Sequence, residues 1–484
     1  MDADKLLKYC LPIFVGLSLR SAVLLHPHSG QNKPPLFGDY EAQRHWMEIT
    51  TNLPTRTWYV NSSDNDLLYW GLDYPPVTAY HSWLMGKISE WLNPSWTKLL
   101  ESRGTESYEH KVFMRYTVLL SDLFIFIPAA LFYFYHASAS LKSNNVITPF
   151  YACLLTLMYP GLILIDHGHY QYNCVSLGLF LACLSSFLLD MDLLGTFLFC
   201  IALGYKQMEF YHALPLFCYL LGKCIHSPLR SGLSKLLKLA LTVVFTFFLV
   251  FFPFLTDKNV FTSVLLRMFP LNRGLYEDKV ANFWCSTSPI IKWRSVFSQF
   301  DLVRLCAAAV LCSSLPVCCA LLVSPKKSRL LYGLASCSLS FFLFSYHVHE
   351  KSILLVALPS LCMFPFCPFS TLLFALVSTL SMWPLYDKDS LIGPCMYLTL
   401  IYFVVGYTVI MRKSCLDCIQ FSWASPNLLL GTILSGYVVL LLGHSVITPP
   451  AAYPDIFPLC ISAYSFVLFF GFWIFWTLGS CRVK

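Results

Sequence analysis

Residues 456–481 read IFPLCISAYSFVLFFGFWIFWTLGSC, a run of 26 residues without an acidic or basic side chain. A helix of this length is long enough to cross the hydrocarbon core of a bilayer. Comparable uncharged runs recur along the chain, at 143–165, 170–189, 239–256, 305–325, 330–346 and 390–411. The sequence therefore predicts an all-α protein that crosses the membrane many times.

A longer apolar run, 352–386, exceeds the length of one span and contains Pro359, Pro365 and Pro368. Because proline interrupts helices, this run predicts two short spans joined by a turn near 364–368. Less hydrophobic spans are expected at about 6–25, 113–135, 192–204, 210–222 and 425–443. Together these runs predict about 14 transmembrane helices, the first of them an uncleaved anchor.

The composition of the 484 residues agrees with this interpretation. Hydrophobic residues make up 57% and charged residues 12%, and the mean hydropathy is +0.61. Soluble domains typically carry about 25% charged residues. A soluble enzyme, a disordered protein and a nucleic-acid binder with a basic domain are therefore excluded. Most of the 20 cysteines lie in apolar runs and are expected to be buried thiols, although a disulfide involving Cys285 remains open.

Basic residues in short loops predict the orientation in the membrane. With the N-terminus in the cytosol, the basic segments at 223–238, 326–329, 412–413 and 482–484 all fall on the cytosolic side. Residues 33–110 fall on the other side, with ten acids against six bases, and they contain the sequon at Asn61, a predicted glycosylation site. In a eukaryotic cell this side is first the lumen of the endoplasmic reticulum.

The unusual polar stretches of the chain all fall on this predicted lumenal side. They are residues 38–50, 69–80, 166–173, 204–212, 267–284 and 347–352. The predicted spans carry few ionisable groups, and the sequence shows no internal repeat. A secondary transporter would place polar groups near the midplane, usually in two related halves. The pattern instead indicates chemistry at one face of the membrane.

The stretch 38–50, GDYEAQRHWMEIT, predicts an amphipathic helix that rests on the membrane surface or on the protein. Its apolar face is formed by Ala42, Trp46, Ile49 and Leu53. Asp39, at the start of the helix, has two compatible interpretations. It can cap the first turn, or it can serve as a general base at the mouth of a membrane-level cavity.

The other stretches offer further candidates for a sugar or phosphate site. In YWGLDYPP, Asp73 and Tyr74 form either a simple turn or an aromatic and acidic sugar contact. In DHGHYQYN, Asp166 and His169, with His167 between them, could supply metal ligands, but interfacial hydrogen bonding is the favoured interpretation.

Cations on the predicted lumenal side suit a phosphate group. In HVHEKS, His349 and Lys351 can donate to a phosphate, while Glu350 can pair with Lys351. The alternative is a set of charges that simply lie at a helix end. Lys206 can pair with Glu209 in the same way. Further candidate substrate contacts are Arg44, Lys206 and Arg273.

Taken together, these stretches resemble the endoplasmic reticulum glucosyltransferases that build the N-glycan precursor. The resemblance covers about residues 10–365 and is weak over the last hundred. It is carried by GDYEAQRHWMEIT, LLYWGLDYPPVTAYHS, PGLILIDHGHYQYN, GYKQMEFYHALP, RMFPLNRGLYEDKVANFWC and FFLFSYHVHEKSILL. It implies a GT-C catalytic membrane region at 1–365, with lumenal loops at about 26–112 and 257–300, and C-terminal transmembrane helices at 366–484.

The resemblance also implies an activity. Such enzymes transfer glucose, with inversion, from dolichyl-phosphate glucose to a dolichol-linked oligosaccharide in the lumen. The intact GDYEAQRHWMEIT and YEDKVANFW favour the member that adds the first glucose, in α-1,3 linkage to Man9GlcNAc2, over the one that adds the second. By similarity, Asp39 matches the catalytic aspartate and His349 matches the contact to the donor phosphate.

The chemistry of such a transfer agrees with the residues at hand. An inverting displacement needs one base for the acceptor hydroxyl, which Asp39 can provide. The leaving phosphate needs positive charge rather than a general acid, and His349 with Lys351 can supply it. We therefore expect no metal and no other cofactor. The expected partners are the lipid donor, the lipid-linked acceptor and the lipids of the endoplasmic reticulum membrane, with no nucleic acid. A transporter of lipid-linked oligosaccharides is the alternative from another class.

Overall fold

The computed structural model describes residues 3–141, 146–270, 274–412 and 425–483. These residues form helices and contain no β-strand, apart from a single bridge between Tyr276 and Val348. The predicted all-α fold is therefore confirmed. Every cysteine in the described residues is a free thiol, including the buried Cys285.

Seven helical stretches in the described residues are long and apolar enough to cross a membrane. They are Tyr108–Tyr135, Pro149–Tyr170, Leu229–Phe254, Gln299–Val323, Ile392–Arg412, Pro426–Val446 and Ile456–Arg482. Shorter apolar helices occur at Asn173–Leu188, Asp192–Tyr205 and Pro368–Leu380. The protein is thus a multi-pass membrane protein, while the count of about 14 spans stays a prediction.

The first half of the chain contains helices of very different lengths. Its main helices are α1 (Ala3–Val23), α2 (Gly38–Asn52), α3 (Pro76–Leu92), α4 (Tyr108–Ser121), α5 (Ile127–Tyr135), α6 (Pro149–Leu157), α7 (Pro160–Ile163), α8 (Asn173–Leu188), α9 (Asp192–Tyr205), α10 (Phe210–Ile225) and α11 (Leu229–Phe251). Two π-helical turns, η3 (Asp122–Phe126) and η5 (Leu164–Tyr170), follow α4 and α7.

In its described part, the second half begins with three small helices. The small helices are α12 (Lys258–Met268), α13 (Phe283–Thr287) and α14 (Trp293–Val296). They are followed by α15 (Gln299–Val323), α16 (Lys327–Phe344), α17 (Ile353–Leu361), α18 (Pro368–Leu380), the short α19 (Trp383–Lys388), α20 (Ile392–Arg412), α21 (Pro426–Val446) and α22 (Ile456–Arg482).

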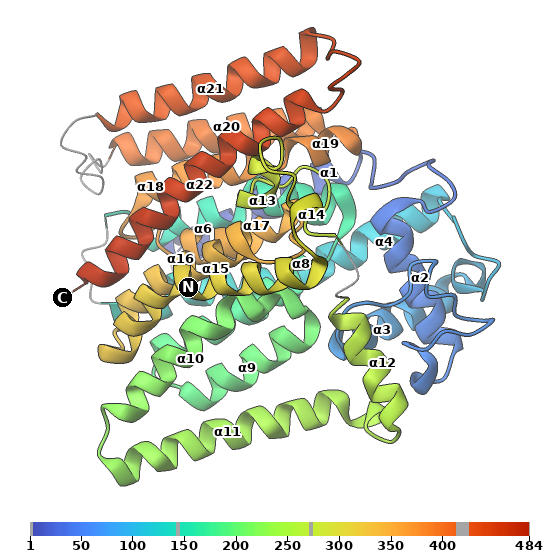
Figure 1. Ribbon diagram of the computed structural model, residues 1–484, viewed down its shortest axis with the longest axis horizontal. Helices are drawn as coiled ribbons and strands as arrows, with labels where there is room; N and C mark the ends of the chain where they lie inside the picture. Colours follow the sequence, from blue (N-terminus) through green and yellow to red (C-terminus); the bar gives the residue numbers. More distant parts are fainter. Residues whose placement is uncertain (1–2, 142–145, 271–273, 413–424, 484) are drawn as a thin grey trace.

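The interior of the bundle is built on α8, α16, α17 and α18. Every residue of α17 and α18 is buried, and the chain breaks between them at the predicted proline-rich turn. By contrast, α11 and α21 run along opposite edges of the molecule (Figure 1) and leave most of their apolar side chains uncovered. Val244 and Val439, for example, are 66% and 69% exposed. Such faces are expected where lipid is the solvent.

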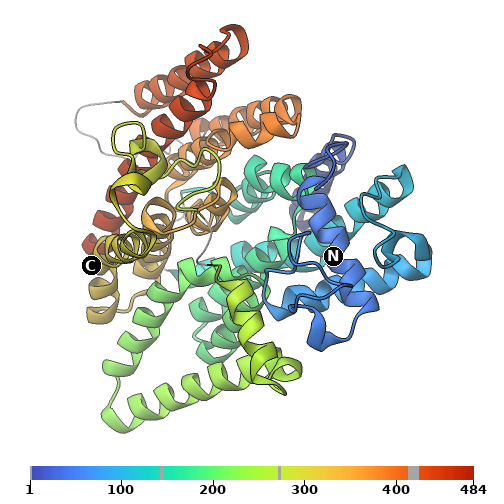
Figure 2. The same ribbon diagram turned by 45° about the vertical axis from the view of Figure 1, so that its right-hand side comes forward.

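A compact group of helices, α2, α3 and α12, lies at one end of the molecule, away from α20–α22, in both views (Figures 1 and 2). The predicted apolar face of α2 is buried here, with Trp46 and Ile49 packed against Ala79 of α3 and Phe254 in one cluster. Helix α2 therefore rests on the protein rather than on the membrane surface. This packing fixes the position of the first turn of α2, which carries Asp39.

Candidate active site

The carboxylate of Asp39 is the centre of a polar cluster drawn from three distant segments. Its Oδ2 accepts from Gln171 Nε2 at 2.6 Å, lies 3.0 Å from His169 Nε2 and also accepts from Lys351 Nζ. His169 lies in η5, Gln171 lies just beyond its end, and Lys351 lies in the short helix η8 (Glu350–Ser352). The Asp39 side chain is 24% exposed, so the cluster is open to solvent on one side.

The backbone before α2 explains why this carboxylate is free to enter the cluster. The residue that caps α2 is Phe37, in a left-handed conformation and without a side-chain bond to the helix. The capping interpretation of Asp39 is therefore wrong. Gly38 is also left-handed, and a Cβ there would lie 2.6 Å from the backbone of Ser29. Glycine lets the two backbone segments touch, and this contact sets the start of the helix.

The neighbours of Asp39 control its ionisation. Burial raises the pKa of Asp39, but the neighbouring Lys351 and His169 outweigh burial and hold that pKa well below its usual range. In the resting protein Asp39 is therefore a carboxylate that is neutralised by its neighbours. A carboxylate in this state can act as a base only after part of the positive charge moves away.

A series of hydrogen-bonded side chains extends from Asp39 towards α8 and α9. Lys206 donates to Asn173 Oδ1 at 2.5 Å, and the Asn173 amide donates to Gln171 Oε1 at 3.1 Å. Burial lowers the pKa of Lys206 to about 8, and Lys351 adds to this effect. Glu209 instead bonds to the ring of His212, so the predicted pairing of Lys206 with Glu209 is wrong.

A small recess adjoins this series of side chains. Its lining is mostly aromatic and amide, a combination that suits the apolar faces and hydroxyl groups of sugars. The lining residues are Gln43, Tyr74, Thr78, Gln171, Tyr172, Tyr205 and Lys206. The structure thus brings the candidates Tyr74 and Lys206 together beside the Asp39 cluster. It places Asp73 next to this wall, where its backbone carbonyl accepts from Gln207 at 3.0 Å.

The DHGHYQYN stretch does not assemble as a metal site. Asp166 is fully buried and accepts from the backbone N–H groups of Asn173 and Cys174, at 3.1 and 2.7 Å, at the start of α8. His167 bonds to Asp122 at 2.7 Å, away from Asp39. Of this stretch, His169 and Gln171 contact the carboxylate of Asp39 directly. Asp166 therefore stabilises the N-terminus of a buried helix.

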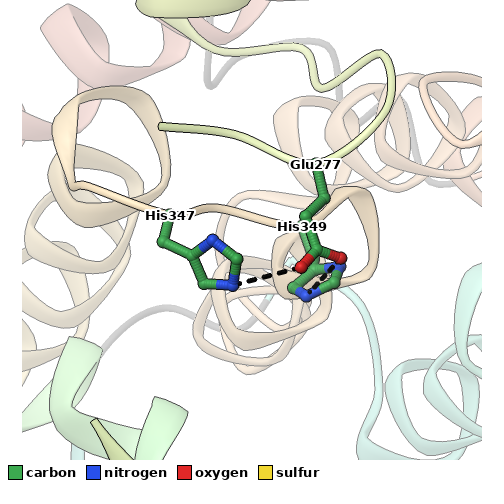
Figure 3. Close-up of side chains that lie close together, drawn as sticks. All are labelled: Glu277, His347 and His349. Carbon is green, nitrogen blue, oxygen red and sulfur yellow. Dashed lines mark ion pairs between the residues drawn. The ribbon is translucent and has the colours of Figure 1, made fainter. Parts of the chain in front are cut away.

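Among the described residues, one group of side chains could hold a metal ion, and it lies beside the predicted phosphate contact. Glu277 is 3.3 Å from His347 Nε2 and 2.9 Å from His349 Nε2 (Figure 3), and the three ligand atoms lie within 4.8 Å of one another. The bridge between Tyr276 and Val348 brings the two segments together. Two histidines and a carboxylate suit zinc or another transition metal. The same arrangement also pairs the ring of His349 with a carboxylate.

The remaining candidates lie apart from the cluster. Arg44 is fully buried between Glu41 and Glu48, at 2.6 and 2.7 Å. Glu350 is buried, and Lys351 pairs with Asp39 instead of Glu350, so that pairing was predicted wrongly. Arg273 lies outside the described residues. Asn61 is exposed, and its glycosylation stays a prediction.

Comparison with known proteins identifies the family of the chain. The ALG6, ALG8 glycosyltransferase family matches residues 6–476. The chain belongs to this glycosyltransferase family. It is 46% identical to the dolichyl pyrophosphate Man9GlcNAc2 alpha-1,3-glucosyltransferase of Gallus gallus, covering 98% of this chain and 97% of the relative. The protein of the same name from Mus musculus is 45% identical, with 97% of each chain covered.

The chain is only distantly similar to a solved structure. The crystal structure of ArnT from Cupriavidus metallidurans bound to undecaprenyl phosphate superposes with a TM-score of 0.42 and 12% identity, over 98% of this chain and 77% of ArnT.

Three residues of this glycosyltransferase's cluster were not predicted. Gln171 and Asn173 lie in the stretch 166–173, but only ionisable residues of that stretch were predicted as site residues. Asp389 was missed altogether, although its Oδ2 lies 2.5 Å from His169 Nδ1. The available signal was an acid at the predicted lumenal end of the span at 390–411. Asp389 also contacts the cluster from beyond residue 365, while the predicted division of the chain at that residue stays a prediction.

Proposed function

We propose that this glycosyltransferase transfers the first glucose from dolichyl-phosphate glucose, in α-1,3 linkage, to Man9GlcNAc2 on dolichyl pyrophosphate. The reaction takes place at the lumenal face of the endoplasmic reticulum, in an enzyme of the GT-C type. Two relatives whose names carry this activity are 46% and 45% identical to the chain over nearly its whole length, which supports these substrates. The observation that carries the site is a solvent-accessible carboxylate, Asp39, in direct contact with a lysine.

Asp39 acts as the base in a single displacement. The acceptor hydroxyl loses its proton to a carboxylate oxygen of Asp39 while its oxygen forms a bond to the anomeric carbon of glucose. The bond between that carbon and the phosphate oxygen breaks on the opposite face. The anomeric configuration is therefore inverted, and dolichyl phosphate leaves.

Lys351 and His349 receive the negative charge that develops on the phosphate. Lys351 now pairs with Asp39, and His349 pairs with Glu277 at 2.9 Å. A donor phosphate offers both cations a stronger anionic partner. When Lys351 turns to the phosphate, the pKa of Asp39 rises because its neighbouring positive charge is withdrawn. Donor binding thus converts a neutralised carboxylate into a competent base.

The recess beside Asp39 is the proposed contact for sugar. The Tyr74 ring, which Lys206 approaches to 5.4 Å from its centroid, offers an apolar face for stacking. Gln171 joins this wall to Asp39 and can orient a hydroxyl group. No step in this mechanism requires a metal ion, because two side-chain cations serve the leaving group.

The test uses purified enzyme in lipid nanodiscs with dolichyl-phosphate glucose. We expect transfer to an acceptor with nine mannoses and none to an acceptor that already carries one glucose. Asp39→Asn should lower kcat about 10²–10⁴-fold, whereas Asp64→Asn, at an exposed carboxylate in the same loop, should match the wild type. Transfer only to the glucosylated acceptor would favour the second-glucose enzyme, and lipid movement without transfer would favour a transporter. Normal turnover by Asp39→Asn would refute the base assignment.

A further inference from the structure

His169 is held between two carboxylates that come from opposite ends of the chain. Its Nε2 lies 3.0 Å from Asp39 Oδ2, and its Nδ1 lies 2.5 Å from Asp389 Oδ2. The side chains of His169 and Asp389 are each only 3% exposed, whereas Asp39 is 24% exposed. Asp389 therefore lies behind the histidine, out of reach of substrate, while Asp39 lies in front of it.

The turn that carries Asp389 is pinned from two sides. It follows α19, and Leu391 N donates back to the carbonyl of Tyr386 at 2.7 Å, which closes the turn. The carbonyl of Lys388 accepts from Lys33 Nζ at 2.8 Å, and Lys388 Nζ contacts Asp278 at 3.1 Å. The position of Asp389 is therefore set by the loops that surround the site, as expected for a group with a defined task.

The contacts of His169 indicate a proton on Nδ1 and leave the state of Nε2 open. An ionised carboxylate only accepts hydrogen bonds, so Nδ1 carries a proton and donates it to Asp389. On the other side, Nε2 faces an acceptor, Asp39, and a donor, Lys351 Nζ at 3.1 Å. Nε2 can thus hold either a proton or a lone pair, which is what a group that relays protons needs.

Other charged groups near the ring are few in the described part of the chain. Arg115 Nη1 donates to the carbonyl of the adjacent Gly168 at 2.9 Å, and the backbone N–H of Ser29 donates to the carbonyl of His169 at 3.0 Å. Both bonds go to the backbone and hold the segment in place. They leave the two ring nitrogens to Asp389, Asp39 and Lys351.

We propose that Asp389 is a positioning residue of the transfer reaction, which acts by holding His169 so that Nε2 takes up the proton that Asp39 removes from the acceptor. This inference rests on the proposed base role of Asp39. The acceptor O–H bond breaks as the new bond to glucose forms, and the proton passes to Asp39. Lys351 has by then moved to the donor phosphate, so the lone pair of Nε2 is free to receive that proton. Water removes the proton from His169 after the products leave.

The proposal makes His169 and Asp389 one functional unit. Replacing Asp389 with asparagine offers Nδ1 an amide donor in place of a carboxylate, which favours the tautomer with the proton on Nε2 and removes the lone pair. We expect Asp389→Asn to lower kcat about 10–100-fold, the range typical for groups that orient a functional histidine. KM for both substrates should stay within about twofold, because Asp389 touches neither.

The experiment measures kcat and KM for Asp389→Asn, His169→Gln and the double variant in nanodiscs. The double variant should be no slower than His169→Gln alone, because Asp389 acts through that ring. The matched control is Asp387→Asn, two residues away, where the carboxylate is 51% exposed and contacts His444; it should keep wild-type kcat. Wild-type turnover by Asp389→Asn, or losses that multiply in the double variant, would overturn the proposal.

A second variant covers the case in which Asp389→Asn does not fold. Asp389→Glu keeps the carboxylate on a longer arm, and its loss of kcat should disappear in the His169→Gln background. A loss that persists there would overturn the proposal. Failure of the proposed function itself is distinguishable, because the wild type would then transfer no glucose to the acceptor with nine mannoses.

Discussion

Two clusters in this protein contain the same three kinds of group, and they use histidines only two residues apart. In the first, Arg20 contacts Asp122 at 2.5 Å and His167 contacts Asp122 at 2.7 Å, and all three side chains are fully buried. In the second, Lys351 and His169 contact Asp39, which is 24% exposed. We call these the closed cluster and the open cluster.

The two clusters differ in access to solvent rather than in composition. Arg20 also donates to the carbonyl of Leu157 at 2.6 Å, so the closed cluster joins α1 to η3 and α6. The ion pairs of this cluster lie entirely inside the protein. The open cluster contains cations that an incoming phosphate can recruit, and it borders the aromatic recess. The predictions below test this distinction.

The largest effect is expected in the closed cluster. Asp122→Asn leaves Arg20 as a buried charge without its carboxylate, which should lower the free energy of unfolding by about 3–5 kcal/mol. Thermal unfolding of the purified variant checks this loss, with Asp64→Asn as the control, and kcat per folded molecule should be retained. A stable Asp122→Asn protein with lost transfer would place the closed cluster in the reaction.

The next largest effect is expected on transfer activity when Lys351 is replaced. Lys351→Met removes the cation that serves both Asp39 and the phosphate, so kcat/KM for the donor should fall about 10²–10³-fold. The pKa of Asp39 should rise without this neighbour, so the acid limb of the residual activity should move to higher pH.

The control for this experiment is Lys87→Met, which removes an exposed lysine paired with Glu90 on α3. It should leave both the rate and the pH profile unchanged. An unshifted acid limb in Lys351→Met would show that Lys351 does not set the ionisation of Asp39.

A smaller effect is expected at Glu277. Glu277→Gln removes the anion that competes with the donor phosphate for His349, so KM for the donor should fall about two- to fivefold with little change in kcat. Steady-state kinetics with varied donor check this, beside Glu90→Gln as a surface control. A higher KM would instead indicate that Glu277 helps to bind the donor.

The smallest effect is expected on removal of metal. Transfer should stay within about twofold after treatment with EDTA, because side-chain cations serve the leaving group. Elemental analysis of the purified protein accompanies the assay. Loss of activity that zinc restores, together with loss in His347→Gln, would assign a functional metal to the Glu277, His347 and His349 group.

The sequence predicted much of this architecture because its signals are local. The uncharged runs located the apolar helices, and the prolines of the 352–386 run located the break between α17 and α18. Orientation by basic loops grouped the polar stretches on one side, and all six contribute residues to the Asp39 cluster, to the pair of Glu277 and His349, or to the recess. Such signals depend on length, charge and nearest neighbours, all of which can be read in the chain.

The contacts inside the cluster could not be predicted, because they depend on how distant segments pack. Asp389 and His169 are separated by 220 positions, and nothing local to either residue indicates the other. Near neighbours such as Glu350 and Lys351 suggested a pair, but the fold gave Lys351 a more distant partner. Spacing alone also could not distinguish His167, in the closed cluster, from His169, in the open one.

We propose that glucose leaves the donor phosphate at the open cluster. The most direct test is an electron cryo-microscopy structure of the wild-type protein in nanodiscs with dolichyl-phosphate glucose bound. We expect a phosphate oxygen within hydrogen-bond distance of Lys351 and His349. The contact between Lys351 and Asp39 should be broken, and Asp39 should face the anomeric carbon. A phosphate bound elsewhere, with Lys351 still paired to Asp39, would contradict this proposal.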